Sequence, residues 1–357
     1  MDAAGPLVPD EIAAGPLMPD EIAARLAPWL GAGAPGGAVL AVSGGPDSTA
    51  LMGCAALLPP CVPVLVATVD HRLRDGSAAE AEAVAAAAAA LGLPHRLLVW
   101  DGPKPVSGIQ DAARQARYAL LAGLAAEVGA ASVLTAHTLD DQAETVLLRL
   151  CRGSGPAGLA GMAPARALGS ATLARPFLDL AKARLVATCA AWGWPAAADP
   201  SNRDPRFARA RLRGLMPALA AEGLTAPRLA RLAGRLRRDE AALDAAAAGA
   251  WDRLRREATG ADRFVLDGVG FLALPEAVAL RLLARAVARA GDARRVRLER
   301  LEALLAALRP ALAGGGATRR TLGGAMVSAA AGRLTVTGAP PRRGPGGRDS
   351  GSVDAAG

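Results

Sequence analysis

Residues 38–51 read AVLAVSGGPDSTAL, and this stretch organises the rest of the chain. Its first half is a short apolar run of the kind that forms a buried strand. The run ends in a Ser-Gly-Gly-Pro turn, after which a helical apolar pattern begins at Asp47. Such an arrangement holds phosphate, because glycines let the backbone approach an anion and the first helical N–H groups point at it.

The loop has neither the lysine and spacing of a Walker A loop nor the G-x-G-x-x-G pattern of dinucleotide-binding proteins. Its Ser-Gly-Gly-x-Asp-Ser form resembles the PP-loop of ATP pyrophosphatases, which bind the β,γ-pyrophosphate of ATP and cut between the α and β phosphates. The alternative is an ordinary strand-to-helix turn. On the first interpretation, the residues that hold ATP are Ser43, Gly44, Gly45, Pro46, Asp47 and Ser48.

Composition limits the class of protein. A chain of 357 residues is long enough for two domains, and 52% of its residues are hydrophobic. The net charge is +8, and nearly all the positive charge is arginine, because Lys104 and Lys182 are the only lysines. A basic surface favours an anionic partner, and nucleic acid is the best candidate.

The cysteines, Cys54, Cys61, Cys151 and Cys189, form no C-x-x-C pair and no Cys/His cluster, so we expect reduced thiols and no zinc site. The N-terminus lacks the basic region of a signal peptide, and the alanine run at 83–90 is too short to span a bilayer. These features predict a cytoplasmic protein with no membrane partner. The oligomeric state is left open, with a homodimer as one candidate.

Between residues 37 and 178, apolar strand-like runs alternate with longer helical patterns, which predicts an α/β domain built on a parallel sheet. Sheets of this kind bind ligands at the carboxyl ends of their strands. The predicted strands are 39–42, 62–69, 96–99 and 131–136, and the predicted helices between them are 49–58, 78–91 and 109–128.

The rest of the chain is divided by its composition. Residues 4–13 and 14–23 are near-perfect copies of each other, and beyond residue 215 the pattern becomes helical, with short strands around Gly323-Gly324 and Gly332. We predict an N-terminal extension at 1–35, a catalytic domain at 36–215, a helical linker at 216–240, a smaller, mainly helical domain at 241–338 and a disordered tail at 339–357.

Two further stretches carry candidate ligand contacts, the first of them at the ligand-binding edge of the predicted sheet. His71, at the end of the second strand, either contacts a ligand or caps the strand. Arg114, Arg117 and Tyr118 share one helix face, because they are spaced at i, i+3 and i+4. Two arginines and a tyrosine suit phosphate contact, and a solvated helix face is the alternative.

The stretch TAHTLDDQAETVLLRL at 135–150 adds acidic residues where the fourth strand ends and a helix begins. Asp141 and Glu144 lie on one helix face, at the same sheet edge as the glycine loop. Paired carboxylates beside a polyphosphate hold Mg²⁺ or position a cationic amine. The alternative is a capping box between Thr138 and Asp141, which leaves Asp140 and Glu144 unexplained.

A basic stretch, DPSNRDPRFARARLR, follows at 199–213. Its arginine density, together with one aromatic residue, is typical of a nucleic-acid-binding surface. A solvated, arginine-rich helix start is the alternative. The arginines in question are Arg203, Arg206, Arg209, Arg211 and Arg213.

Taken together and in this order, the motifs closely resemble the tRNA(Ile)-lysidine synthetase family. The resemblance covers residues 36–225, and the match beyond it is weak. Other PP-loop families share the first motif without the whole set. The motifs are SGGPDS at 43–48, VDHRLR at 69–74, AARQARY at 112–118, TAHTLDDQAETVLLRLCRGSG at 135–155, GLAGM at 158–162, RPFL at 175–178 and DPSNRDPRFARARLR at 199–213.

The resemblance implies an enzyme that uses ATP to adenylate the C2 oxygen of the wobble cytidine in the CAU anticodon of tRNA(Ile). Free L-lysine then attacks C2 through its ε-amine and displaces AMP, which leaves lysidine. By similarity, the catalytic set is Asp47, Arg114, Asp141 and Glu144, with Asp47 and Asp141 as Mg²⁺ ligands. The basic stretch and the C-terminal domain are expected to contact the tRNA.

Three rival functions have different requirements. A PP-loop tRNA thiolase would need cluster or redox cysteines, and an amidotransferase-type synthetase would need a glutaminase partner or domain. A non-catalytic tRNA-binding protein would not need Asp47 or the pair Asp141 and Glu144. The sequence therefore favours the lysidine-forming reaction.

Overall fold

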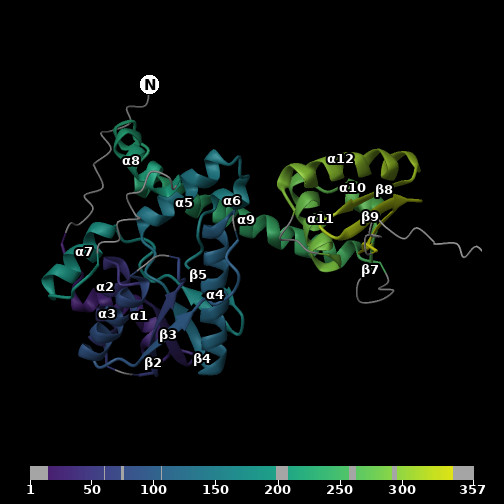
Figure 1. Ribbon diagram of the computed structural model, residues 1–357. Coiled ribbons are helices and arrows are strands. Elements are labelled where there is room, and N and C mark those ends of the chain that lie inside the picture. The colour runs from purple at the N-terminus through teal and green to yellow at the C-terminus, as the bar shows by residue number, and fades with distance from the viewer. Residues whose placement is uncertain are drawn as a thin grey trace, which may run out of the picture. The chain divides into compact units, whose positions relative to one another are not determined.

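The computed structural model describes residues 15–59, 61–73, 76–105, 107–197, 208–256, 263–291 and 296–340. The chain divides into two compact units, and the boundary lies between Arg237 and Arg238. Figure 1 follows the chain through both units. None of the helices within the described ranges is long and apolar enough to cross a membrane.

The N-terminal unit is built on a six-stranded sheet in the order β3-β2-β1-β4-β6-β5. All neighbouring strands pair in parallel except β5 and β6, which are antiparallel. The predicted parallel α/β architecture is therefore confirmed, and the four predicted strands correspond to β1–β4. The strands are β1 (Gly37–Ala41), β2 (Val64–Asp70), β3 (His95–Val99), β4 (Ala130–Leu134), β5 (Ala165–Leu168) and β6 (Ala171–Ala174).

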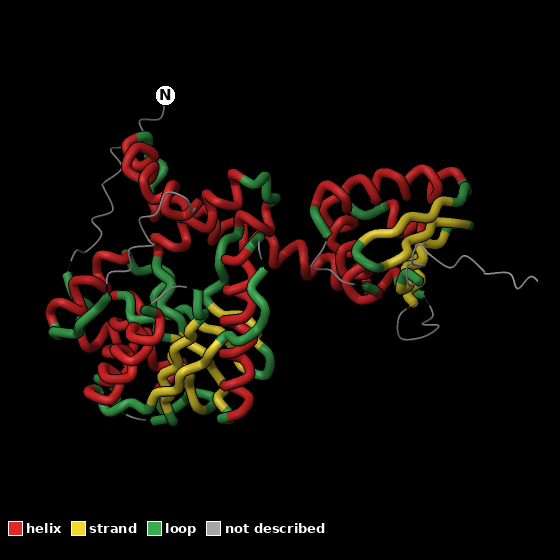
Figure 2. The backbone as a smooth tube through the Cα atoms, in the orientation of Figure 1, coloured by secondary structure: helices red, strands yellow, loops and turns green. Residues whose placement is uncertain are grey.

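Helices cover both faces of this sheet (Figure 2). One face packs against Ile22, Leu51 and Leu185, and the other against Leu121 and Leu124. Because both faces are covered, the central strands are almost continuously apolar. The helices are α1 (Pro19–Leu30), α2 (Pro46–Ala56), α3 (Ser77–Ala90), α4 (Ile109–Glu127), α5 (Leu139–Cys151), α6 (Pro156–Leu159), α7 (Lys182–Ala191), α8 (Ala208–Ala221) and α9 (Ala226–Leu254), the last of which crosses the unit boundary.

Helix α1 arises from the second copy of the N-terminal repeat. Leu17, Ile22 and Leu26 are buried in the same core as the helix that follows the glycine loop. This part of the predicted N-terminal extension is therefore packed into the N-terminal unit. The first copy of the repeat, the stretch 198–207 and the tail from residue 341 lie outside the described residues.

The C-terminal unit combines helices with a four-stranded antiparallel sheet in the order β7-β10-β9-β8. The sequence predicted mainly helix with short strands around the glycines. Gly323 and Gly324, with φ of 56° and 75°, lie between β8 and β9, where a tight hairpin turn requires positive φ. The elements are β7 (Arg263–Asp267), α10 (Gly268–Leu272), α11 (Glu276–Ala290), α12 (Leu298–Gly314), β8 (Thr318–Leu322), β9 (Ala325–Ala330) and β10 (Arg333–Gly338).

Candidate active site

The glycine loop joins β1 to α2 as a tight, internally bonded turn. The backbone N–H of Ser43 donates to Ser48 Oγ at 3.1 Å, and Ser48 Oγ donates to the carbonyl of Gly45 at 3.0 Å. Gly44 has a φ of 84°, which disfavours any other residue, and a Cβ there would lie 3.2 Å from a methyl group of Val84. Pro46 begins α2, where its missing N–H costs nothing, and the N–H groups that follow it in the first turn are donors suited to an anion.

A lysine reaches this loop from another part of the chain. Nζ of Lys182, the first residue of α7, lies 2.5 Å from Asp47 Oδ2. The other oxygen of Asp47 is buried and has no hydrogen-bond partner among the described residues. Burial raises the pKa of Asp47, the charges of Asp141 and Asp140 add to this rise, and Lys182 opposes it. The loop motif lacks a lysine, but the folded site has one.

The position of Lys182 is set by Asp140. Asp140 Oδ2 accepts a hydrogen bond from the backbone N–H of Lys182 at 2.7 Å, at the N-terminus of α7. Next to it, the backbone N–H of Leu139 donates to the carbonyl of Leu180 at 2.8 Å. A carboxylate is favourable at a helix N-terminus because of the free N–H groups there. Asp140, which capping of α5 did not explain, thus links the start of α5 to the start of α7.

Asp141 both caps its own helix and faces the site. One oxygen, Oδ2, accepts from the backbone N–H of Thr138 at 2.9 Å, which completes the predicted capping box. The other oxygen lies 3.9 Å from Nη2 of Arg213 on α8. The two interpretations of Asp141 from sequence are therefore compatible, because each uses a different oxygen.

Glu144 is almost completely buried, with 3% of its surface exposed, and pairs with the same arginine. Arg213 Nε lies 2.5 Å from Oε1 of Glu144, and Nη2 lies 3.2 Å from Oε2. Burial raises the pKa of Glu144, and Arg213 opposes this effect. Burial also lowers the pKa of Arg213, but Glu144, Asp141 and Asp47 outweigh it. The loop aspartate and the acidic pair therefore act on one guanidinium.

His137 is a further group at this edge that the sequence analysis did not single out. Its Nδ1 lies 2.9 Å from Oγ1 of Thr135, just beyond β4. Burial lowers its pKa to about 3, helped by Arg117, Arg175 and Arg114, while Asp141 acts in the opposite direction. The ring is therefore neutral at physiological pH. The signal in the sequence was the position of His137 between the end of a predicted strand and the acidic pair, Asp141 and Glu144.

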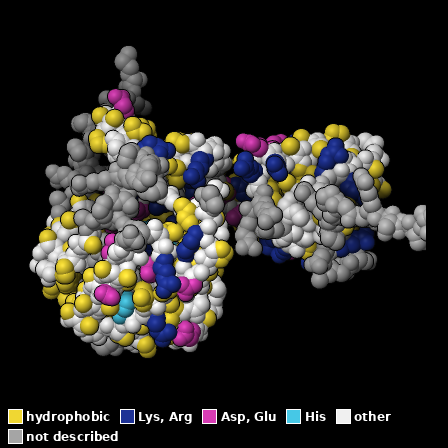
Figure 3. All heavy atoms as spheres, in the orientation of Figure 1, with side chains coloured by type: hydrophobic (Ala, Val, Ile, Leu, Met, Phe, Trp, Pro, Cys, Tyr) yellow, Lys and Arg dark blue, Asp and Glu magenta, His cyan; other side chains and the backbone are white. Residues whose placement is uncertain are grey.

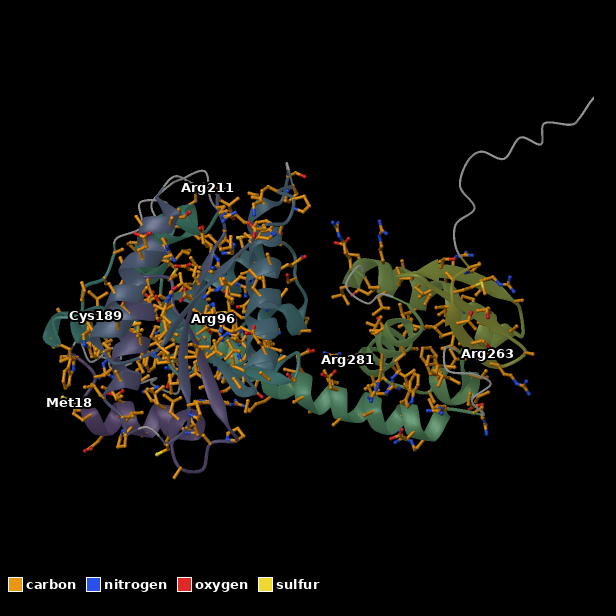
Figure 4. All side chains as sticks on the ribbon, turned by 60° about the horizontal axis from the view of Figure 1, so that its bottom comes forward. Met18, Arg96, Cys189, Arg211, Arg263 and Arg281 are labelled. Carbon is orange, nitrogen blue, oxygen red and sulfur yellow. The ribbon has the colours of Figure 1, made fainter. Side chains whose placement is uncertain are left out.

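The remaining predicted residues are only partly described. Arg114 lies on α4 and contributes to the positive field at His137. Arg209 lies near enough to Glu144 to affect its pKa, and Arg211 is exposed on α8 (Figure 4). Arg203 and Arg206 lie outside the described residues.

Comparison with known proteins identifies the class of the fold. Residues 20–219 match the family model of the PP-loop domain. The fold is similar to that of the U34-tRNA thiolase NcsA from Methanococcus maripaludis, with a TM-score of 0.51 and 14% identity over 61% of this chain and 78% of that one. The chain is thus an α/β protein of the PP-loop class.

Closer relatives specify the family. The tRNA(Ile)-lysidine synthase of Methylobacterium sp. (strain 4-46) is 67% identical over 96% of this chain and 98% of its own. That of Methylobacterium nodulans is 65% identical over 96% and 99%, and that of Rhodopseudomonas palustris is 51% identical over 86% and 91%. The chain belongs to the tRNA(Ile)-lysidine synthase family.

Proposed function

We infer that this protein uses ATP to join L-lysine to C2 of the wobble cytidine in the CAU anticodon of tRNA(Ile), releasing AMP and pyrophosphate. Family membership at 67% identity supports the reaction. The observation that carries it is the set of contacts that joins the loop to the start of α5, since Lys182 Nζ lies 2.5 Å from Asp47 Oδ2 and the backbone N–H of Lys182 donates to Asp140. One site therefore combines a phosphate-binding loop with acids suited to an amine.

The loop and its attached groups would receive the triphosphate of ATP. The first N–H groups of α2 and the glycine backbone supply donors for the phosphate oxygens. Lys182 supplies the positive charge that a Walker A loop takes from its own lysine, and it pairs with Asp47 at 2.5 Å. A nucleotide would draw Lys182 toward the pyrophosphate, because phosphate carries more negative charge than one carboxylate.

The residues at the loop fit a magnesium ion. Mg²⁺ is usually held by one or two carboxylates and completed by substrate phosphates and water. Asp47 offers a buried oxygen without a hydrogen-bond partner, and Asp141 offers the oxygen not used in its cap. The described residues contain no group of three or more His, Cys, Asp or Glu side chains placed to hold a metal ion. Bound there, Mg²⁺ would neutralise charge on the departing pyrophosphate.

The acidic pair would then serve the amine. Lysine arrives as a cation, which Asp141 and Glu144 attract in place of Arg213. For the transfer, the ammonium first gives one proton to a carboxylate, and the freed lone pair of the ε-nitrogen then bonds to C2. The bond from C2 to the oxygen of the AMP group breaks, so that AMP departs with that oxygen. Burial raises the pKa of Glu144, which suits this carboxylate to accept that proton.

The arginines of the stretch 199–213 would contact the anticodon loop. A single-stranded RNA loop is anionic and exposes its bases, so it meets arginine readily. Arg209, Arg211 and Arg213 lie on α8, directly beside α5 and its acidic residues. A cytoplasmic location and a homodimer stay predictions from the sequence.

Nucleoside analysis tests the function most simply. The purified protein is incubated with ATP, isotope-labelled L-lysine and an unmodified tRNA(Ile) transcript carrying CAU, and the digested RNA is analysed by mass spectrometry. We expect labelled lysidine with one AMP per lysidine formed. A transcript with GAU in the anticodon is the matched control and should stay unlabelled. AMP formation without labelled nucleoside, or label in both transcripts, would overturn the proposal.

A further inference from the structure

Four arginines surround one tyrosine on the α4 side of the N-terminal unit. Arg114 and Arg117 come from α4, Arg166 from β5, and Arg175 follows β6. The Cζ atoms of Arg114 and Arg166 lie 5.1 Å and 5.0 Å from the ring centroid of Tyr118. We call these five residues the Tyr118 cluster. The ring gives two guanidinium groups a favourable surface, but it cannot neutralise them.

The most deeply buried arginine of the Tyr118 cluster is Arg175. Arg175 is 4% exposed, and its Nη1 donates to the carbonyl of Ala163 at 2.6 Å. Its Nε is buried and has no hydrogen-bond partner within the described part of the chain. Burying a charge is costly unless an opposite charge compensates it. Arg175 therefore carries positive charge and a free donor into a site that lacks an anion of its own.

The cluster as a whole is uncompensated. Within the described ranges, none of its arginines forms an ion pair with a carboxylate, whereas Arg25, Arg184 and Arg213 in the same unit all do. The positive charges of the cluster shift the pKa of its own tyrosine. Burial pushes the pKa of Tyr118 upward, yet Arg114, Arg117 and Arg175 bring it below its ordinary value.

The cluster continues toward the proposed RNA-binding helix. Burial lowers the pKa of Arg149 on α5, and the positive charges of Arg114 and Arg209 lower it further. Basic residues therefore extend from β5 across α4 and α5 to α8. Figure 3 shows dark blue side chains over the part of the N-terminal unit where Figure 1 labels α4 and β5. Arg114 and Arg166 are exposed there, so a large ligand can reach them.

We propose that the Tyr118 cluster binds backbone phosphates of the tRNA, as a second contact beside that of α8. The inference rests on the proposed function for the identity of the RNA. A lone carboxylate, such as that of lysine, would leave most of the four positive charges uncompensated. Asp47 at the glycine loop is already paired with Lys182 at 2.5 Å, whereas Arg114 and Arg166 lie over the ring of Tyr118. Successive phosphates along a strand match a spread of arginines on two elements.

Salt dependence of tRNA binding tests the proposal without any chemistry. Unmodified tRNA(Ile) is titrated with the full-length protein at several salt concentrations, in the absence of ATP and lysine. Each lost contact to single-stranded phosphate should lower the slope of log K against log salt by about 0.7. We expect Arg166→Gln to lower the slope by about that amount, and Arg117→Gln combined with it to lower the slope by about twice as much.

Two further variants make the result specific. Arg96→Gln is the matched control, because Arg96 is exposed and already paired with Glu127 at 3.1 Å, and it should leave the slope unchanged. Arg166→Lys keeps the charge and should keep most of the slope. An unchanged slope in the double variant, or an equal fall in Arg96→Gln, would overturn the proposal.

Titrations with the small substrates exclude the other anions. The Kd for ATP and the Kd for lysine should stay within about twofold in Arg166→Gln. Weaker binding of ATP or of lysine with unchanged tRNA binding would assign the cluster to that ligand and overturn the RNA site. Because binding is measured on unmodified RNA, failure of this proposal is distinct from failure to form lysidine.

Discussion

At the glycine loop and along α5, acidic side chains pair with basic ones. Around Tyr118, the described arginines lie together without an acidic partner. Asp47 meets Lys182 at 2.5 Å and Glu144 meets Arg213 at 2.5 Å. No carboxylate pairs with the arginines of the Tyr118 cluster among the described residues. A paired site can exchange its internal partner for a ligand of either charge. An unpaired site can only gain an anion. The first arrangement suits chemistry on ATP and an amine, and the second suits holding RNA.

The largest effect should come from breaking the paired loop. Asp47→Ala removes the half-buried carboxylate that faces Lys182 and, on our proposal, Mg²⁺. We expect ATP consumption to fall by about 1,000-fold or more, because the loop loses the carboxylate that pairs with Lys182 and that would hold Mg²⁺ at the pyrophosphate. Release of AMP from labelled ATP is the measurement, and tRNA binding within a few-fold of the wild type is the control. AMP release near the wild-type rate would contradict the assignment of the loop.

Two substitutions of Lys182 test whether its charge or its size matters in the pair with Asp47. Lys182→Met keeps the length of the side chain and removes the charge, so we expect KM for ATP to rise about 10- to 100-fold. Lys182→Arg, which keeps the charge, should recover most of the loss. Steady-state kinetics at varied ATP concentration provide the measurement. Equal KM values for the two variants would show that Lys182 has only a structural role toward Asp47.

The sequence predicted the local parts of this site and missed the long-range ones. The glycine loop, the start of α5 and strands β1–β4 depend on neighbouring residues, whose patterns are visible in one stretch. Lys182 lies 135 residues from Asp47, and Arg213 lies 69 residues from Glu144. No spacing rule connects residues that far apart, so only packing of α7 and α8 brings them to the loop and to α5. Strand β7 was missed because its partner, β10, is also distant in the chain.

On the RNA side, the arginines of α8 should give a smaller effect than the loop. Arg209→Gln combined with Arg211→Gln removes two charges beside the acidic pair. We expect tRNA affinity to fall about tenfold at moderate salt and the salt slope to decrease by about 1.4. Fluorescence anisotropy at several salt concentrations measures both. If the slope stayed constant while the Tyr118 cluster variants lowered it, the RNA would contact α4 and β5 rather than α8.

The smallest effect concerns stability in acid. The pKa of His137 is lowered to about 3 in the fold, mainly by burial, whereas an unfolded histidine has a pKa of about 6.5. The unfolded chain therefore binds more protons between these values, and stability is lost as pH falls through this window. The loss from this residue is about 1 kcal/mol per pH unit. Urea unfolding at pH 6.5 and pH 5 should show a smaller decrease for His137→Gln than for the wild type, and equal decreases would contradict the buried, neutral ring.

The central claim is that the glycine loop serves activation of the base and the acidic pair serves the amine. The most direct test uses one variant that changes only the acidic pair. Glu144→Gln leaves the loop, Asp47 and Lys182 intact, and removes the carboxylate that, on our proposal, accepts the proton of the amine. With ATP, lysine and unmodified tRNA(Ile), we predict that adenylated RNA accumulates in rapid-quench samples while lysidine forms at least about 100-fold more slowly. Lysidine formation at the wild-type rate, or loss of the adenylated RNA together with lysidine, would contradict a site in which the loop activates the base and the acids serve the amine.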